Sequence, residues 1–267
     1  MTPATASATE NGSRGTSVIV NVLQIVRCFT VDEPLQGVTE IAAQVGLHKS
    51  SVSRILATLE QEHVVERDEF SRKYRLGLGL IAVAGPLLAN LDVRRVAMED
   101  LQVLAERTRE TAALAIWDGG AAVTVEQIPS RRQVKHTSAL GSRYTTGLSA
   151  SVQVLLAAQD PQRVRDLVAD EGIRLDESTG VDAYLDRLAT VRREGHAVNF
   201  GLTAPDEVGI AAPVHDHRGH VVAAVLLAAP AYRIMEQDVP ELVESCRVAA
   251  RRISARLGAV DEGPGAD

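Results

Sequence analysis

The sequence predicts an α+β protein of two domains that are joined by a linker helix. Three observations support this prediction. Short apolar stripes with helical spacing and two β-prone segments fill the first part of the chain, a long apolar segment follows, and strand pairs then alternate with helices. Strands joined by hairpins, with helices between them, are typical of an antiparallel sheet that helices cover.

The first part of the chain predicts three helices and a hairpin. Apolar residues recur with helical spacing over residues 17–29 and 38–45, and again after the tight turn that begins at Gly46. Glycine often follows the last residue of a helix. Two β-prone segments, 64–67 and 73–76, come next and are joined by a polar turn. None of these elements can bury its apolar side alone, so we expect them to share one core.

A long apolar segment, residues 78–91, follows the hairpin. It is apolar almost all round, whereas an exposed linker helix would be polar over most of its surface. We therefore expect it to contact a second subunit, together with Val18 and Val22 of the first helix. Pro86 should kink or break this helix, because proline lacks a backbone N–H group.

The rest of the chain alternates between strand and helix patterns. Asp118, Gly119 and Gly120 separate two β-prone runs and are typical of a hairpin turn. We expect a further short strand over residues 133–140. The remaining strand patterns cover 196–200, 207–214 and 220–230, and the helix patterns cover 149–158, 161–169, 182–194 and 238–257.

The composition narrows the possible classes of protein. The 267 residues suffice for two domains, and 45% of them are hydrophobic, so each domain can bury a core. The net charge of −7 argues against a protein that coats nucleic acid with its whole surface, but not against a small local contact. The chain has no apolar run long enough to span a bilayer, no signal-peptide pattern and only two, distant cysteines. We therefore expect a cytoplasmic protein with reduced thiols.

The third helix, which starts near Lys49, has two different faces. Its apolar residues cluster on one side, while small polar residues and Arg54 lie on the other. Hydroxyl groups, a lysine and helix N-terminal amides suit phosphate oxygens, and an arginine can donate two hydrogen bonds to a guanine edge. With the preceding helix and turn this is helix-turn-helix geometry, and the hairpin adds a basic wing. The predicted DNA contacts are Lys49, Ser50, Ser51, Ser53, Arg54 and Thr58 of the helix and Ser71, Arg72 and Lys73 of the wing.

This part of the chain resembles the winged helix-turn-helix of the IclR family of bacterial transcriptional regulators. The resemblance lies in the run GLHKSSVSRILATLE, residues 46–60, and in YRLG, residues 74–77. Later segments follow in family order, among them GSRYTTGLSASVQVLLA and GHAVNFGLTAPDEVGIAAPVHDHRGHVVAA. The resemblance covers about residues 17–258.

The resemblance implies a DNA-binding regulator, most often a repressor of a catabolic operon, that binds its operator as a dimer or tetramer. We expect a disordered tail, a winged helix-turn-helix, a linker helix, a GAF-like effector-binding domain and a flexible tail over residues 1–14, 15–78, 79–93, 94–258 and 259–267. The partners implied are double-stranded operator DNA, a small-molecule effector and further copies of the chain. No cofactor is predicted.

Three segments have counterparts in the effector pockets of the family. The effector site implied by the resemblance consists of Ala150, Ser151, Asn199, Gly209, Leu226 and Ala228. Many relatives carry other residues in these segments: histidine at Gly147, lysine at Gln153, an acidic residue at Asn199, cysteine at Gly209, and serines at Leu226 and Ala228. The site has thus lost polar groups and gained apolar surface.

We therefore expect a neutral, largely hydrophobic or aromatic effector rather than a small polar 2-oxo acid. Its polar end would be held by Asn199 and by the backbone amides of Ala150 and Ser151 at a helix start. The alternative is that Leu226 and Ala228 are ordinary core residues of a domain whose pocket has closed.

Three other readings of these motifs stay open. A protein-interaction module would also explain the helix-turn-helix and the apolar linker. A hydrolase could use Ser149, although the run GLSAS has Ser151 where a nucleophile elbow needs glycine. The run HDHRGH, residues 215–220, concentrates histidines, but it is typical of an exposed turn rather than a metal site, and we predict no metal. Gly77 and Gly79 are expected to be packing glycines.

Overall fold

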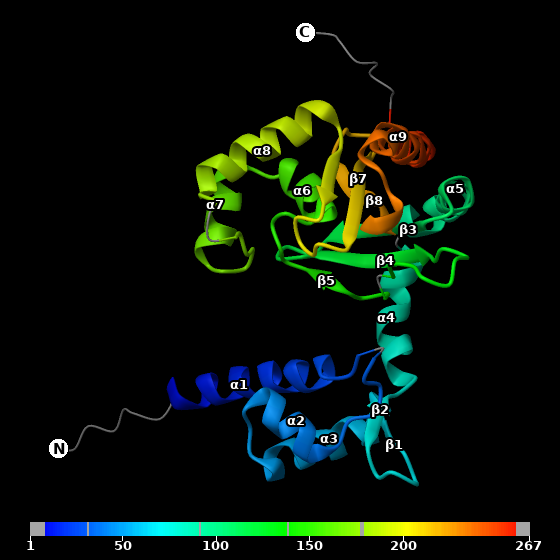
Figure 1. The fold of residues 1–267 in the computed structure, drawn as a ribbon. Helices are drawn as coiled ribbons and strands as arrows, with labels where there is room; N and C mark the ends of the chain where they lie inside the picture. Colours follow the sequence, from blue (N-terminus) through cyan, green and yellow to red (C-terminus); the bar gives the residue numbers. More distant parts are fainter. Residues whose placement is uncertain (1–8, 31, 91, 138, 177–178, 260–267) are drawn as a thin grey trace, which may run out of the picture. The chain divides into compact units, whose positions relative to one another are not determined.

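The computed structural model describes residues 9–259 except 31, 91, 138 and 177–178 (Figure 1). The chain divides after Asn90 into two compact units. Each unit has its own buried apolar core, and each is described here by itself.

The first unit is a winged helix-turn-helix. Its elements are α1 (Thr9–Arg27), α2 (Val38–Val45), α3 (Lys49–Gln61), β1 (Val65–Arg67), β2 (Tyr74–Leu76) and α4 (Gly79–Asn90). Strands β1 and β2 pair antiparallel, with Val65 opposite Leu76. The apolar sides of the helices and the hairpin meet in one core, formed by Ile25, Phe29, Ile41, Ala42, Val52, Leu56, Leu59, Val65 and Tyr74.

Two expectations about the helices of this unit were wrong. Helix α1 begins at Thr9, inside the segment expected as a disordered tail. Once a helix is nucleated, each added residue costs little, so the helix extends beyond its apolar stripe. Helix α4 continues through Pro86 to Asn90, so the helix does not end at this proline. The expected break at Pro86 therefore does not occur.

Gly77 and Gly79 are packing glycines, as expected. A Cβ atom at Gly77 would lie 2.3 Å from the backbone oxygen of His63, and one at Gly79 would lie 2.6 Å from the same atom. The backbone N–H of Gly79 donates to that oxygen at 3.0 Å. Any side chain at either position would push the start of α4 away from the end of α3.

The second unit is an antiparallel sheet covered by helices. Its strands are β3 (Thr111–Trp117), β4 (Ala122–Ile128), β5 (Arg143–Tyr144), β6 (Ala197–Phe200), β7 (Glu207–His215) and β8 (Val221–Pro230). Their order across the sheet is β5-β4-β3-β8-β7-β6. The helices are α5 (Asp92–Thr108), α6 (Ala150–Ala157), α7 (Pro161–Ala169), α8 (Val181–Glu194) and α9 (Val239–Arg256), with short 3-10 turns η1 (Ala231–Arg233) and η2 (Glu236–Asp238).

The strand expected over residues 133–140 does not form in the described part of that segment. Its backbone oxygens accept hydrogen bonds from side chains instead. Arg233 Nη1 donates to the oxygen of Val134 at 3.1 Å, and Thr111 Oγ1 donates to the oxygen of His136 at 2.6 Å. The short edge strand β5 lies slightly later, at Arg143–Tyr144. These side chains bind backbone oxygens that would otherwise need the N–H groups of a neighbouring strand. The strand predicted from the β-prone pattern is therefore wrong.

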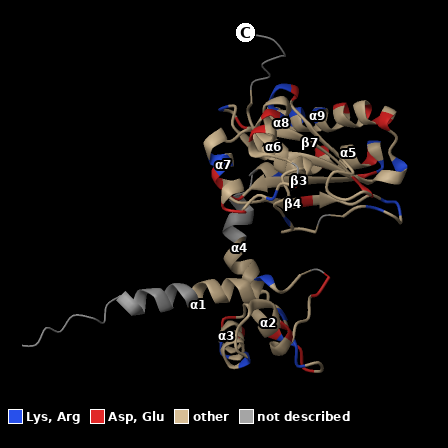
Figure 2. Cartoon of the chain, turned by 60° about the vertical axis from the view of Figure 1, so that its left-hand side comes forward, with Lys and Arg blue, Asp and Glu red and all other residues tan. Residues whose placement is uncertain are grey.

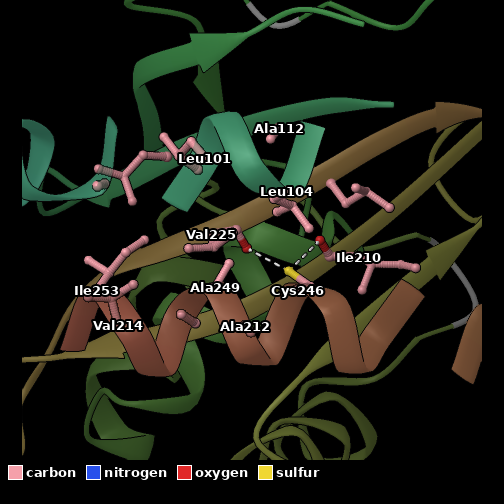
Figure 3. Close-up of a cluster of buried hydrophobic side chains, with 14 of the residues drawn as sticks. Leu101, Leu104, Ala112, Ile210, Ala212, Val214, Val225, Cys246, Ala249 and Ile253 are labelled. Atoms are coloured by element: carbon pink, nitrogen blue, oxygen red, sulfur yellow. Dashed lines mark hydrogen bonds between the residues drawn. The ribbon is translucent and has the colours of Figure 1, made fainter. Parts of the chain in front are cut away.

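Helices α5 and α9 cover one face of the sheet, and an apolar core fills the space between them (Figure 3). Cys246 in α9 lies at its centre, with its Sγ 3.6 Å from the backbone oxygen of Ile210 and 3.5 Å from that of Val225. Helices α6, α7 and α8 share a second core with the opposite face. Figure 2 shows that strands β3 and β7 are almost free of charged residues, which gather on the helices and loops. Among the residues described, no helix has the length and hydropathy needed to cross a membrane.

Candidate functional site

The turn between α2 and α3 sets the direction in which α3 points. Gly46 has a left-handed backbone, with φ of 68°, and its N–H donates to the oxygen of Ala42. Glycine adopts this conformation without steric cost, so α2 can end abruptly and α3 can begin at Lys49. At the other end of α2, the Glu40 carboxylate accepts a hydrogen bond from the N–H of Gly37 at 2.8 Å.

The two faces of α3 are separated as the sequence predicts. Val52, Leu56 and Leu59 are buried in the core. The predicted DNA contacts on this helix are exposed, except for the half-buried Ser51. The first turn of α3 carries no acidic residue, so nothing there repels a phosphate from its N-terminal amides. The hydroxyl of Thr58 donates to the oxygen of Arg54 at 3.1 Å, which leaves the hydroxyl oxygen free to accept.

Hydrogen bonds to a carboxylate fix the turn at the tip of the hairpin. The Asp68 carboxylate accepts hydrogen bonds from the N–H and the hydroxyl of Ser71, both at 2.7 Å. The hydrogen bond from the Ser71 side chain lowers the pKa of Asp68 below its ordinary value, although the little desolvation present acts against it. Arg72 has a positive φ of 60°. The Ser71 hydroxyl is therefore used to build the turn, while the Arg72 side chain extends from it.

The cations of the hairpin fall into two groups. Lys73 Nζ lies 2.8 Å from Glu40 Oε1, and Arg75 lies 3.1 Å from Glu66. Arg67 stacks over the ring of Tyr74, 5.6 Å from its centroid. Arg72, by contrast, forms no ion pair with the described residues. The charge of Lys73, predicted to contact DNA, is thus already balanced within the domain.

Three of the predicted effector residues are neighbours across the sheet. Asn199 in β6 pairs with Gly209 in β7, and Gly209 pairs with Ala228 in β8. The row continues to Thr111 in β3. Side chains directly opposite each other in antiparallel strands point to the same face, so these residues form one strip.

Gly209 lies where this strip meets α6. A Cβ atom at Gly209 would lie 3.7 Å from Ala150 Cβ, 3.8 Å from Asn199 Cβ and 3.8 Å from Leu226 Cδ1. The structure therefore brings together residues from α6, β6, β7 and β8 that are far apart in the sequence. Ser151, which follows Ala150, is buried as well.

The polar groups around this strip are held by local hydrogen bonds. Asn199 Nδ2 donates to Thr203 Oγ1 at 2.5 Å, and its Oδ1 accepts from the N–H of Leu202 at 2.8 Å. An effector that binds the Asn199 amide must therefore replace a bond within this loop. Farther along the same face of the sheet, opposite Ala115, the hydroxyl of Thr124 is buried without a hydrogen-bond partner among the described residues. A buried hydroxyl of this kind is costly unless something else binds it.

The residues at the start of α6 that differ from many relatives have structural partners. A Cβ atom at Gly147 would lie 2.5 Å from Leu175 Cδ2, and the Tyr184 hydroxyl donates to the oxygen of Gly147 at 2.8 Å. Gln153 is buried, donates to the oxygen of Leu148 at 2.8 Å and accepts from Arg187 Nε at 2.7 Å. Gly147 and Gln153 are thus both fitted into the packing of α6 and α8.

Two cavities lie beside the hairpin that joins β7 to β8, and neither is lined by the predicted effector residues. One of about 390 Å³ lies on the α6 side, and one of about 770 Å³ lies on the α9 side. The described residues contain no group of three metal-ligating side chains. In the run HDHRGH, Asp216 instead shapes the turn, because its Oδ1 accepts from the N–H groups of Arg218 and His220 at 2.8 and 3.0 Å.

Comparison with known proteins identifies both units. The model for the IclR helix-turn-helix domain matches residues 18–69. The model for the bacterial transcriptional regulator IclR C-terminal domain matches residues 86–255. The chain belongs to the IclR family of bacterial transcriptional regulators.

Individual relatives of this IclR-family regulator match over nearly their full length. The HTH-type transcriptional regulator KdgR of Escherichia coli (strain K12) is 30% identical over 247 residues, which cover 91% of this chain and 93% of KdgR. The HTH-type transcriptional repressor AllR of Salmonella typhimurium is 27% identical over 254 residues, 94% of this chain and 93% of AllR. A crystal structure of an IclR homologue from Microbacterium hydrocarbonoxydans, complexed with 4-hydroxybenzoate, is 26% identical, with a TM-score of 0.75 over 90% of this chain and 98% of that one.

The predicted family, α+β fold and DNA-binding function of this IclR-family regulator are thereby confirmed. Sequence reasoning overlooked two residues near its sites. Phe70 lies in the turn of the hairpin with 96% of its surface exposed. Its position in the run DEFSR, beside the serine and arginine that were chosen, could have revealed it. Thr111 had no motif of its own, and only the pairing of β3 with β8 places it beside the effector strip.

Proposed function

We propose that this IclR-family regulator binds a two-fold related operator as a dimer or tetramer and represses transcription until an aromatic effector binds. The observation that carries the DNA part is the outward face of α3. It presents small polar side chains, N-terminal amides and Arg54 together, without a nearby carboxylate in its first turn. Small side chains let the backbone approach a phosphate, and Arg54 can reach a base edge in the major groove.

The proposed oligomer rests on exposed apolar surface in the first unit. Val18, Ile19, Val20 and Leu23 of α1 are exposed, as are Leu78, Ile81 and Val83 around the start of α4. Exposed apolar side chains in such number are typical of an interface with another protein. One helix and one wing also make too small a contact for tight specific binding, so a second winged helix-turn-helix is needed.

The proposed effector class rests on the strip formed by Asn199, Gly209 and Ala228. Gly209, Ala228 and Leu226 offer small and apolar surface, which suits a planar ring better than a small polar acid. The first amides of α6 supply polar partners for one end of the ligand. The homologue that binds 4-hydroxybenzoate supports this class. We propose repression because AllR is a named repressor.

The proposed control follows from linkage between two binding equilibria. An effector changes DNA binding only if it binds one state of the regulator more tightly than the other. The Thr111 hydroxyl donates to the backbone oxygen of His136, and the Asn199 amide donates to Thr203 Oγ1. An effector that enters the strip must displace local hydrogen bonds of this kind, so the loop that contains His136 is suited to such a change. Effector binding then favours a state in which the winged helix-turn-helix units of two copies of the chain no longer match the two half-sites of the operator.

Selection of binding sites from a pool of random duplexes tests the DNA part. We expect two half-sites related by a two-fold axis, and an affinity that falls steeply as salt rises, because phosphate contacts release counterions. Failure to enrich any duplex, with the protein folded, would favour a protein-interaction module.

Thermal-shift measurements test the effector class. We expect 4-hydroxybenzoate and benzoate to raise the melting temperature more than pyruvate and glyoxylate do, because the strip is apolar. Stabilisation by the 2-oxo acids alone would contradict the proposal. The addition of a stabilising acid to the selected duplex complex then shows whether the acid releases DNA.

Catalysis by Ser149 is not part of the proposed function. Its hydroxyl lies 3.5 Å from the hydroxyl of Ser151, which cannot act as the base that a serine nucleophile needs. An assay with p-nitrophenyl esters checks this point. We expect no difference in hydrolysis between the native protein and the Ser149→Ala variant.

A further inference from the structure

We propose a second ligand site, separate from the effector strip, that binds a small molecule carrying a phosphate group. It is the cavity of about 770 Å³ between the β7–β8 hairpin and α9. This volume is typical of cavities that hold metabolites. Its walls come from the hairpin, the end of α8 and the second half of α9, with Pro213, Arg218, Arg247, Arg251, Ser254 and Ala259 among the lining residues.

Three guanidinium groups line this cavity. Arg247 and Arg251 lie one turn apart on α9, and Arg218 lies at the tip of the hairpin that faces them. Arginine is well suited to phosphate, because its planar group donates several hydrogen bonds at once and stays charged. A site with arginines from two separate elements can hold a phosphate from two sides.

The positive charge of this cavity is only partly balanced. Glu244, which does not line the cavity, lies 2.6 Å from Arg251 and 3.9 Å from Arg247. Arg218 forms no ion pair with the described residues, and its Nε donates to His217 Nε2 at 3.3 Å. Asp216 is the only carboxylate among the described residues that line the cavity. Among the described residues, three guanidinium groups are thus balanced by two carboxylates, one of which lies outside the lining, in a protein whose net charge is −7.

The other arginine pair on α9 provides a contrast. Arg252 and Arg256 also lie one turn apart, but they face α5, where Glu99 and Asp100 lie. Arg256 lies 2.6 Å from Glu99 and 3.1 Å from Asp100, and Arg252 lies 3.9 Å from Asp100. Each of these arginines therefore has a carboxylate from a neighbouring helix. Arg247 and Arg251 face the cavity instead of a neighbouring helix.

The cavity is built from fixed backbone. Asp216 holds the hairpin turn by accepting from two N–H groups, and Ser254 Oγ accepts from the N–H of His215 at 2.9 Å, which ties the hairpin to α9. Pro213 and small residues of α9, such as Ala250 and Ala255, form a less polar wall. A fixed site loses little entropy on binding, and the apolar wall suits the carbon skeleton of a phosphate ester.

Binding measurements with phosphate esters and their parent alcohols test this site. Isothermal titration calorimetry of the full chain would use glucose 6-phosphate, glycerol 3-phosphate and inorganic phosphate as probes, with glucose and glycerol as uncharged controls. We expect at least one phosphate ester to bind in the micromolar to millimolar range, more tightly than its parent alcohol. Equal binding of esters and alcohols, or no binding of any phosphate probe, would overturn the proposal.

Matched arginine variants locate the binding. Arg247→Ala and Arg218→Ala should each weaken binding of that ester by about tenfold, because each removes a charge-assisted hydrogen bond. Arg252→Ala, on the same helix but facing Asp100, should leave it unchanged. An equal loss in Arg252→Ala would mean that general charge, not this cavity, attracts the ester. Circular dichroism of each variant confirms the fold, and the response to aromatic acids should be retained because the effector strip is separate.

Discussion

Lys73 in the hairpin donates to both carboxylate oxygens of Glu40 in α2, at 2.8 and 3.0 Å. The same carboxylate accepts from the N–H of Gly37 at the start of α2. One acidic side chain therefore both caps a helix and fixes the wing beside it. The hydrogen bond from Lys73 lowers the pKa of Glu40 below its ordinary value. This contribution to stability is present above that ordinary value and is lost as the pH falls through the lowered pKa.

Two wing variants should separate the role of Lys73 from that of Arg72. Arg72→Ala should reduce the slope of log affinity against log salt by about one, because one phosphate contact is lost. Lys73→Met should change that slope much less, since Glu40 already balances the lysine charge. Fluorescence anisotropy with the selected duplex at several salt concentrations measures both. A full unit of slope lost in Lys73→Met would show that this lysine leaves Glu40 for DNA.

Arg54 should determine sequence specificity. We expect Arg54→Ala to weaken binding to the selected duplex by about 5- to 150-fold, which corresponds to the loss of one bidentate base contact. Arg54→Lys keeps the charge but not the two-point geometry, so it should retain non-specific binding and lose discrimination. Competition with unrelated DNA measures the ratio of specific to non-specific affinity. The idea fails if Arg54→Lys discriminates as well as the native protein.

Phe70 should add an apolar contact to DNA at the tip of the wing. A side chain that is 96% exposed contributes little to the fold, and aromatic wedges of this kind enter the minor groove in other proteins. We expect Phe70→Ala to weaken specific binding by about tenfold without lowering the melting temperature. Phe70→Leu should retain most of the affinity. A drop in melting temperature with unchanged DNA affinity would instead indicate a packing role.

Gly209→Ala should close the effector strip without unfolding the domain. The added methyl group would have its nearest neighbours at 3.7 and 3.8 Å, which is ordinary van der Waals contact. We expect the native melting temperature but a smaller thermal shift with the aromatic acid, because the methyl group occupies the centre of the strip. Gly120→Ala, in a hairpin with open space around it, is the matched control. Equal ligand responses in both variants would place the effector elsewhere.

The Cys246 thiol should be unreactive in the folded protein. Burial raises its pKa to about 12, so almost no thiolate is present near pH 8. In a test with a disulfide reagent, Cys246 should react only after denaturant is added, whereas the half-buried Cys28 reacts slowly in the native state. The raised pKa also means that its protonated form favours folding below pH 9, and that this advantage is lost as the pH rises toward 12. Mass spectrometry of labelled peptides identifies which thiol has reacted.

Patterns within single elements predicted most of the fold. Apolar spacing placed α2, α8, α9 and the start of α3 within one or two residues, and the run Asp118-Gly119-Gly120 placed the turn between β3 and β4. These features depend on neighbours along the chain, which the sequence displays directly. The segment 133–140 was mistaken for a strand because its backbone partners, Thr111 and Arg233, are distant in sequence.

By itself, the sequence determined that α3 has one core face and one polar face, since helical periodicity alone fixes which residues share a side. It also determined the family, through the runs around Gly46 and Tyr74. Only the tertiary structure decided which polar groups remain available. Lys73 is bound to Glu40 and Asn199 to Thr203, whereas Arg72 and Arg218 form no ion pair within the described chain. Such pairings join elements or loop residues through three-dimensional contacts that no periodicity encodes.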